Sequence, residues 1–126
     1  MPLSVILVNY KMREELLACL ESLARDASGL AWEAVVVDND SRDGSQRAVA
    51  QRFPAVRYVA NPANVGYAKA VNRGLSLTTG PYVLVMNPDC VVERGALGAL
   101  MAYLDAHAEA AVMGPQILDG RGHIEY

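Results

Sequence analysis

The sequence predicts an α/β fold, with a mostly parallel sheet and helices on both of its faces. Short apolar runs rich in valine alternate along the chain with longer segments whose apolar residues recur at helical spacing. This alternation is typical of parallel strands joined by right-handed crossovers. Two of the apolar runs pass directly into acidic and amide residues, which places polar groups where open α/β sheets bind ligands.

The predicted strands and helices can be placed in order. The first strand is a short β-branched run ended by Asn9, and the helix after it repeats leucine at helical spacing. Ser41 or Asp43 can cap the second helix, which Pro54 ends. The run over residues 81–86 is continuously apolar, as expected when both faces of a strand are covered. The predicted strands are residues 3–8, 33–37, 56–59, 81–86 and 110–113, and the predicted helices are residues 14–27, 45–52, 65–77 and 93–104.

The composition is that of one ordinary globular domain. The chain has 126 residues, of which 52% are hydrophobic and 20% are charged, with a net charge of −3. This charge argues against a nucleic-acid partner, and no apolar run approaches the roughly 18 residues of a membrane span. The amino terminus lacks the features of a signal peptide, and Cys19 and Cys90 are too few for a disulfide framework. A cytoplasmic protein is therefore expected.

Residues 115–126 are expected to form a tail outside the α/β domain. Gly114 and Pro115 end the fifth predicted strand, and Asp119 with Gly120 predicts a hairpin turn between residues 116–118 and 123–126. We therefore expect an α/β domain over residues 1–114 and a tail over residues 115–126 that leads toward a further region.

Asp38 follows three valines at the end of the second predicted strand. An uncompensated buried carboxylate is costly, so Asp38 needs either a structural or a binding role. In the structural role, its side chain accepts hydrogen bonds from the backbone of residues 39–41 in an Asx-turn. In the binding role, it meets a base, a ribose or a metal ion.

Asn87 and Asp89 follow the fourth predicted strand and lie two residues apart, so their side chains can project the same way. Amide and carboxylate oxygens suit Mg²⁺ or Mn²⁺ held together with phosphate oxygens. The alternative is an ordinary turn at Pro88, with Asp89 capping the next helix.

Residues 64–74 form a further polar group. Asn64 can cap the helix that follows, and Gly66 permits close approach of a backbone or a ligand. Lys69 and Asn72 share a helical face and could meet a phosphate and a sugar or base, the alternative being a solvated face. The buried side of this helix is expected to consist of Ala68, Val71 and Leu75.

Four segments in this order resemble family 2 glycosyltransferases: residues 4–10, 35–45, 64–74 and 84–89. They resemble the N-terminal, nucleotide-sugar-binding half of these enzymes, which has the Rossmann-like GT-A fold, in a branch that includes bacterial rhamnosyltransferases. The resemblance implies sugar transfer to an acceptor hydroxyl in the synthesis of bacterial surface polysaccharides. The implied donor is a UDP- or dTDP-sugar, and the implied acceptor is a saccharide or a lipid-linked group, which would bring the enzyme to the inner membrane face.

The resemblance also implies roles for single residues. Asn9 and Tyr10 would line the nucleotide site, and Asp38 would accept a hydrogen bond from the pyrimidine base. Asp89 would bind Mg²⁺ or Mn²⁺ at the D-x-D position of the family, where Asn87 replaces the first acidic residue and would contact the ribose or the diphosphate. The other implied nucleotide-binding residues are Asn64, Gly66, Lys69 and Asn72.

The catalytic base is not among these segments. In the family, an Asp or Glu of a C-terminal half takes the acceptor proton, so the base is expected beyond Tyr126. Asp119 and Glu125 do not match this base, because they lie in the predicted hairpin. We therefore expect a fragment that binds the donor and transfers sugar poorly. An apolar surface left uncovered is expected to make this fragment a homo-oligomer.

Two other functions stay open on the sequence alone. A non-catalytic nucleotide-binding or assembly module would share every binding residue and lack the base. A haloacid dehalogenase-like phosphatase would use Asp38 as nucleophile and Asp40 as acid. That family also needs a lysine after a later strand, and Lys69 does not follow one.

Overall fold

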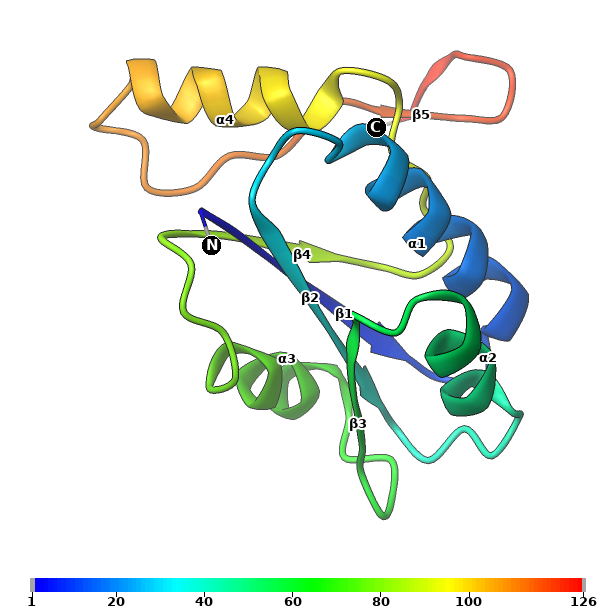
Figure 1. Cartoon of the computed structure of the whole chain (residues 1–126). Helices are drawn as coiled ribbons and strands as arrows, with labels where there is room; N and C mark the ends of the chain where they lie inside the picture. Colours follow the sequence, from blue (N-terminus) through cyan, green and yellow to red (C-terminus); the bar gives the residue numbers. More distant parts are fainter. Residues whose placement is uncertain (1, 126) are drawn as a thin grey trace.

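A computed structural model describes residues 2–125, in which four parallel strands form the central sheet. The strand order is β3-β2-β1-β4, so that β1 lies between β2 and β4 (Figure 1). This architecture confirms the predicted α/β fold. The strands are β1 (Leu3–Asn9), β2 (Trp32–Asp38), β3 (Arg57–Ala60) and β4 (Tyr82–Met86), and the helices are α1 (Arg13–Asp26), α2 (Ser45–Arg52), α3 (Tyr67–Leu75) and α4 (Ala96–Ala106).

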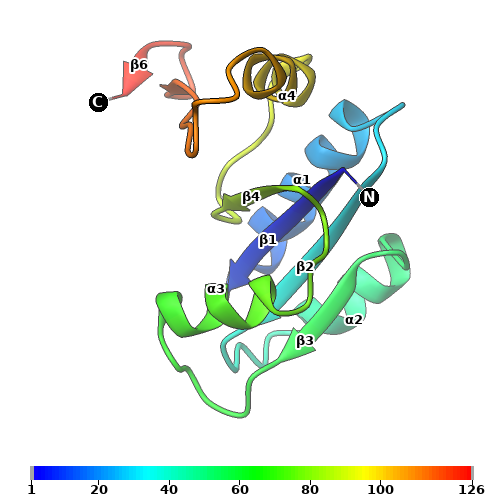
Figure 2. The same cartoon turned by 90° about the vertical axis from the view of Figure 1, so that its left-hand side faces the viewer.

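The larger core lies between the sheet and helices α1, α2 and α4. Alternate residues of β1, such as Val5 and Leu7, point into this core and are fully buried. They meet Leu16 and Leu20 of α1, which are also fully buried. Helix α3 covers the opposite face of the sheet over β1 and β2, as Figure 2 shows. The two layers of helices fix the sheet whose edge carries the polar residues.

Helix α3 packs closely on the sheet through its smallest residues. Ala70 and Gly74 are buried, and a Cβ atom at Gly74 would lie 2.6 Å from Cγ2 of Ile6. Ala68 is exposed and Leu75 is 41% exposed, so the predicted buried stripe is wrong at these two positions. The close approach selects the smallest side chains rather than the most apolar ones, and this shifts the buried side of the helix.

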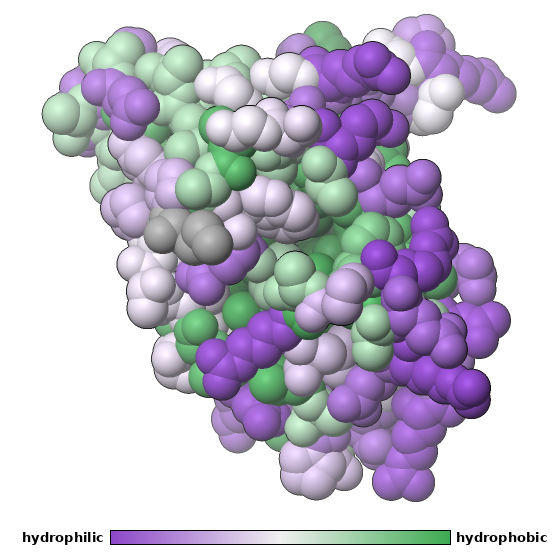
Figure 3. All heavy atoms as spheres, viewed as in Figure 1, coloured by the Kyte–Doolittle hydropathy of each residue, from purple (hydrophilic) through white to green (hydrophobic). Residues whose placement is uncertain are grey.

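Strand β4 is covered on one face only. Tyr82 and Leu84 pack against the larger core, whereas Val83 and Val85 are 42% and 40% exposed. The expectation that both faces are covered is therefore wrong, because α3 lies over β1 and β2 and leaves this outer strand open. Figure 3 shows hydrophobic residues at the surface in the centre of the molecule, with polar residues gathered toward the side of α1 and α2.

The fifth predicted strand, over residues 110–113, is absent. This segment is irregular, and Val112 is 90% exposed. Ala110 and Ala111 offer little side chain to pack on a pleated sheet, and Pro115 follows closely. Among residues 2–125, β4 therefore pairs with β1 alone.

The predicted hairpin is present in the tail. Strands β5 (Ile117–Leu118) and β6 (Ile124–Glu125) pair in antiparallel fashion, and Tyr126 lies outside the described residues. The Asp119 carboxylate accepts hydrogen bonds from the backbone N–H groups of Arg121 and His123, both at 2.8 Å, and the bonds to His123 and Arg121 lower the pKa of Asp119. None of the helices formed by residues 2–125 is long and apolar enough to cross a bilayer.

Candidate functional site

The carboxyl ends of β1, β2 and β4 meet at one edge of the sheet. Asn9 lies opposite Asp38 in the pairing of β1 with β2, and Leu7 lies opposite Met86 in the pairing of β1 with β4. Two strand spacings, or about 10 Å, therefore separate the ends of β2 and β4. The sheet places Asp38 and residues 87–89 at the same edge, as the sequence predicts.

Asp38 is held by its neighbours and is only 5% exposed. Its Oδ1 accepts hydrogen bonds from Nδ2 of Asn9 at 2.8 Å and from Oγ of Ser41 at 2.5 Å, and its Oδ2 accepts one from the N–H of Ser41 at 2.9 Å. Burial and the charge of Asp38 raise the pKa of the adjacent Tyr58. Asp38 thus makes the turn-stabilising contacts of its structural role, and both oxygens are engaged, which argues against a phosphatase nucleophile.

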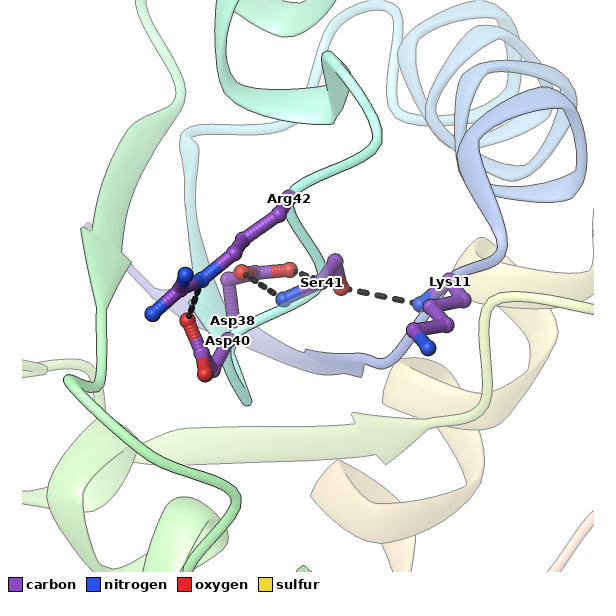
Figure 4. Close-up of polar contacts among 5 residues, drawn as sticks. All are labelled: Lys11, Asp38, Asp40, Ser41 and Arg42. Atoms are coloured by element: carbon purple, nitrogen blue, oxygen red, sulfur yellow. Dashed lines mark hydrogen bonds and ion pairs between the residues drawn. The ribbon is translucent and has the colours of Figure 1, made fainter.

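Two strained turns lie side by side around this cluster. Lys11, Asp40 and Arg42 have left-handed backbones, with φ values of 53°, 64° and 51°. This conformation is unfavourable for residues with a Cβ atom and persists only where surrounding contacts hold it. Oγ of Ser41 accepts a hydrogen bond from the N–H of Lys11 at 2.8 Å, so the turn after β1 is tied to the turn after β2 (Figure 4). Strain of this kind is concentrated at functional sites.

The two turns form the wall of a cavity of about 700 Å³. This volume falls within the roughly 300–1,000 Å³ of typical small-molecule sites. Tyr10 and Lys11 come from the turn after β1, residues 39–43 from the turn after β2, and Asn64 from the loop after β3. The cavity therefore lies where open α/β sheets bind nucleotides.

The charges of the cavity wall are only partly paired. Nε of Arg42 lies 2.7 Å from Oδ1 of Asp40, and this hydrogen bond raises the pKa of Arg42. Oδ1 of Asp43 accepts a hydrogen bond from the N–H of Ser45 at 3.0 Å, so Asp43 rather than Ser41 supports the start of α2. Lys11 makes no ion pair within residues 2–125, and its Nζ lies 5.2 Å from the centre of the Tyr10 ring.

Asn39 is a site residue that the sequence reasoning missed. It is 3% exposed, its Nδ2 donates to the carbonyl of Gly66 at 3.2 Å, and its Oδ1 accepts from Nδ2 of Asn61 at 2.9 Å. Gly66 has φ 85° and ψ 172°, a conformation open almost only to glycine, and its N–H donates to Oδ1 of Asn64 at 3.0 Å. Asn39 thus fastens the loop that carries Asn64 to the tip of β2. In the sequence, only the position of Asn39 next to Asp38 could have indicated this role.

The remaining predicted residues do not line the cavity. Lys69 and Asn72 are exposed on α3, and Asn87 and Asp89 are exposed after β4. Asn9 is fully buried behind the wall, where its Oδ1 has no hydrogen-bond partner within the described chain.

The side-chain oxygens that follow β4 could hold a divalent cation only together with the phosphates of a bound ligand. No group of three or more His, Cys, Asp or Glu residues forms a metal site within residues 2–125. Mg²⁺ is often bound by one or two carboxylates plus substrate phosphates, and the exposed oxygens of Asn87 and Asp89 are compatible with that arrangement. Asp89 does not cap the next helix, because the carboxylate of Asp26 accepts from the N–H groups of Gly95 and Leu97.

Comparison with known proteins identifies sequence relatives. The profile described as Glycosyl transferase family 2 matches residues 4–123. The N-acetylglucosaminyl-diphospho-decaprenol L-rhamnosyltransferase of Mycobacterium tuberculosis is 32% identical over 97% of this chain and 43% of its own length. The uncharacterized glycosyltransferase YibD of Escherichia coli is 33% identical over 69% of this chain and 26% of its own length. The chain thus spans less than half the length of these relatives.

Solved structures share the fold. Residues 1–349 of TarS from Staphylococcus aureus, solved in complex with UDP-GlcNAc, superpose with a TM-score of 0.77 at 28% identity, over 86% of this chain and 32% of the solved TarS chain. A mannosyltransferase of Pyrobaculum calidifontis, solved with GDP-Man and Mn²⁺, has a TM-score of 0.76 at 24% identity, over 95% of this chain and 36% of its own, and bears on the fold alone. The chain therefore belongs to glycosyl transferase family 2 and has the Rossmann-like GT-A fold of the N-terminal, nucleotide-sugar-binding half of these enzymes.

Proposed function

We propose that this chain is the donor-binding part of a glycosyltransferase that moves a sugar from a nucleoside diphosphate sugar to an acceptor hydroxyl. The observation that carries the proposal is the cavity of about 700 Å³ at the carboxyl edge of the sheet, in a chain of this family. Relatives named for rhamnosyl transfer and for teichoic acid biosynthesis support a role in building a bacterial surface polysaccharide.

Within the cavity, Tyr10 and Asn64 are proposed to contact the nucleoside. Tyr10 is 46% exposed and offers a ring face on which a pyrimidine can stack. Oδ1 of Asn64 is engaged by Gly66, which leaves its Nδ2 to donate to the ligand. Asn9 and Asp38 are proposed to act indirectly, by holding the two turns that form the wall.

Asn87 and Asp89 are proposed to hold Mg²⁺ or Mn²⁺ together with the phosphates of the donor. When bound, such an ion would neutralise the charge that builds on the leaving diphosphate. Asp89 would supply a carboxylate oxygen and Asn87 an amide oxygen, both from the exposed segment after β4.

The acceptor and the base that deprotonates it are proposed to bind outside this chain. They would be held by a region that corresponds to the part of the relatives that this chain does not match. The name of the Mycobacterium tuberculosis relative describes an acceptor linked to diphospho-decaprenol, so a lipid-linked saccharide at the inner membrane face is the proposed acceptor class. The open face of β4, with Val83 and Val85, is proposed to make this chain self-associate. A monomer at all concentrations by light scattering would contradict the last point.

Titration calorimetry with UDP and dTDP, with and without Mn²⁺, tests the proposal. We expect one of the two nucleotides to bind, and Mn²⁺ to tighten the binding. Tyr10→Ala should weaken it by the roughly 1–3 kcal/mol of a base-aromatic stack. Asp89→Asn should abolish the effect of Mn²⁺, whereas the exposed Glu109→Gln serves as a matched control. A folded protein that binds neither nucleotide would leave only the assembly-module alternative.

A further inference from the structure

We propose that Lys11 binds the diphosphate of the donor and that Ser41 is the residue that positions it. This inference rests on the proposed function and deepens it. It starts from the two cationic side chains that line the cavity, Lys11 and Arg42.

The charge pairing of the wall leaves Lys11 available for an anion. Nε of Arg42 lies 2.7 Å from Oδ1 of Asp40, so a carboxylate already faces this guanidinium. Lys11 has no carboxylate partner within residues 2–125. Its Nζ lies 5.2 Å from the centre of the Tyr10 ring, which is the proposed stacking surface for the base. A nucleotide on Tyr10 would therefore bring its phosphates within reach of this ammonium group.

The backbone of Lys11 is fixed in an unfavourable conformation by a buried relay. Its φ of 53° is held by the hydrogen bond from its N–H to Oγ of Ser41, at 2.8 Å. Ser41 is 4% exposed and donates in turn to Asp38. In Figure 4, Lys11 stands at one end of this relay with its ammonium joined to none of the residues drawn, whereas Arg42 and Asp40 contact each other. A held backbone reduces the entropy that a flexible lysine loses on binding.

Lys69 is the matched comparison. It is the lysine that the sequence suggested for a phosphate, and it is exposed on α3 without lining the cavity. The two lysines thus carry the same charge, and their placement relative to the cavity distinguishes them.

The test compares UDP with uridine by calorimetry in the presence of EDTA, so that no metal ion masks the lysine. Lys11→Met keeps the apolar stem and removes the charge, and it should weaken UDP about 10- to 100-fold, leave uridine unchanged and flatten the salt dependence of UDP binding. Lys69→Met should change neither ligand. Ser41→Ala should also weaken UDP more than uridine, and Ser41→Thr should restore the ratio, because a threonine hydroxyl can replace that of serine.

Lys11→Gly provides a second measurement, because glycine adopts a positive φ without strain. This variant should raise the melting temperature while it lowers the affinity for UDP. A lower melting temperature would show that the lysine backbone is not held under strain.

Each remaining outcome decides the matter. Equal losses of UDP and uridine in Lys11→Met would assign Lys11 to the nucleoside instead of the diphosphate, and a UDP-specific loss in Lys69→Met would assign the phosphate to Lys69. If Lys11→Met leaves UDP binding unchanged, the inference about Lys11 is wrong but the proposed function still stands. A wild-type protein that binds neither ligand overturns the proposed function, and the inference with it.

Discussion

Both edges of the sheet carry a carboxylate bound to a serine hydroxyl, and only the carboxyl edge borders the cavity. At the amino edge, Oγ of Ser4 donates to Oε1 of Glu33 at 2.6 Å, and the N–H groups of Thr79 and Gly80 donate to Glu33 and Ser4 at 3.1 and 3.0 Å. These bonds fasten the entry of β4 to β1 and β2. As with Asp38 at the other edge, a carboxylate here accepts hydrogen bonds from a serine hydroxyl and from a backbone N–H group.

The two edges differ in exposure and in backbone strain. Glu33 is partly exposed, whereas Asp38 is buried. Among residues 2–125, the non-glycine residues with positive φ are Lys11, Asp40 and Arg42, all at the carboxyl edge, whereas the loop that precedes β2 uses Gly29. A carboxylate–serine pair at a strand end is therefore no sign of function by itself. Strained non-glycine residues beside a cavity distinguish the edge proposed to bind the nucleotide from the opposite edge.

Removing each carboxylate gives the largest test of this difference. Asp38→Ala should lower the free energy of unfolding by about 2–4 kcal/mol, because Nδ2 of Asn9 and both donors of Ser41 lose a buried acceptor. Glu33→Ala should cost about 1 kcal/mol or less, since water can replace the carboxylate. Urea denaturation followed by circular dichroism measures both, and equal losses would remove the distinction between the edges.

Two glycines allow a matched test of backbone conformation. Gly66 and Gly29 have φ values of 85° and 89°, and a Cβ atom at either would meet no atom within 4 Å among the described residues beyond its chain neighbours. Alanine at each should therefore cost about 1–3 kcal/mol of stability through the backbone alone. Gly66→Ala should also weaken UDP binding, because the loop that carries Asn64 would shift, whereas Gly29→Ala should leave it intact. Loss of UDP binding in both variants would mean that general destabilisation explains the effect.

The smallest expected effect is the pH dependence of the amino edge. The hydrogen bond from Ser4, followed by that from Thr79, lowers the pKa of Glu33 below its ordinary value of 4.5. A carboxyl whose folded pKa is depressed stabilises the fold above its unfolded pKa, and this stability is lost as the pH falls through the folded pKa. Glu33→Gln should therefore lose less than about 1 kcal/mol at pH 7. The difference from wild type should shrink below pH 4.5, and a difference that grows on acidification would contradict the assignment.

The sequence predicted most of the fold because the signals are local. A run of valines predicts a buried strand from its own residues. The helix at residues 45–52 was likewise predicted with the bounds that the structure shows. The cover over β4 and the buried side of α3 were wrong, because each depends on a neighbour distant in sequence. The strand at residues 110–113 was also wrong, because Ala110 and Ala111 offer little side chain to pack on a sheet and Pro115 follows closely. The contact of Gly74 with Ile6 is an example, since no local pattern announces it.

The candidate site was predicted in part. Tyr10 and Asn64 line the cavity, and Asp38 adopts the structural role that its position allowed. Lys11 and Asn39 were not predicted. Lys11 is distinguished by its left-handed backbone, and Asn39 by hydrogen-bond partners more than 20 residues away, so a strand-end pattern in the sequence reveals neither residue.

The central position of β1 has a consequence for how the polypeptide assembles. β1 pairs with β2 after a separation of roughly 30 residues and with β4 after roughly 80, and longer closures cost more chain entropy. On the ribosome, the segments that form the cavity wall emerge well before Asp89 does. We therefore expect that half of the binding edge to order first, and pulse-labelled hydrogen exchange during refolding should protect β1 and β2 before β4.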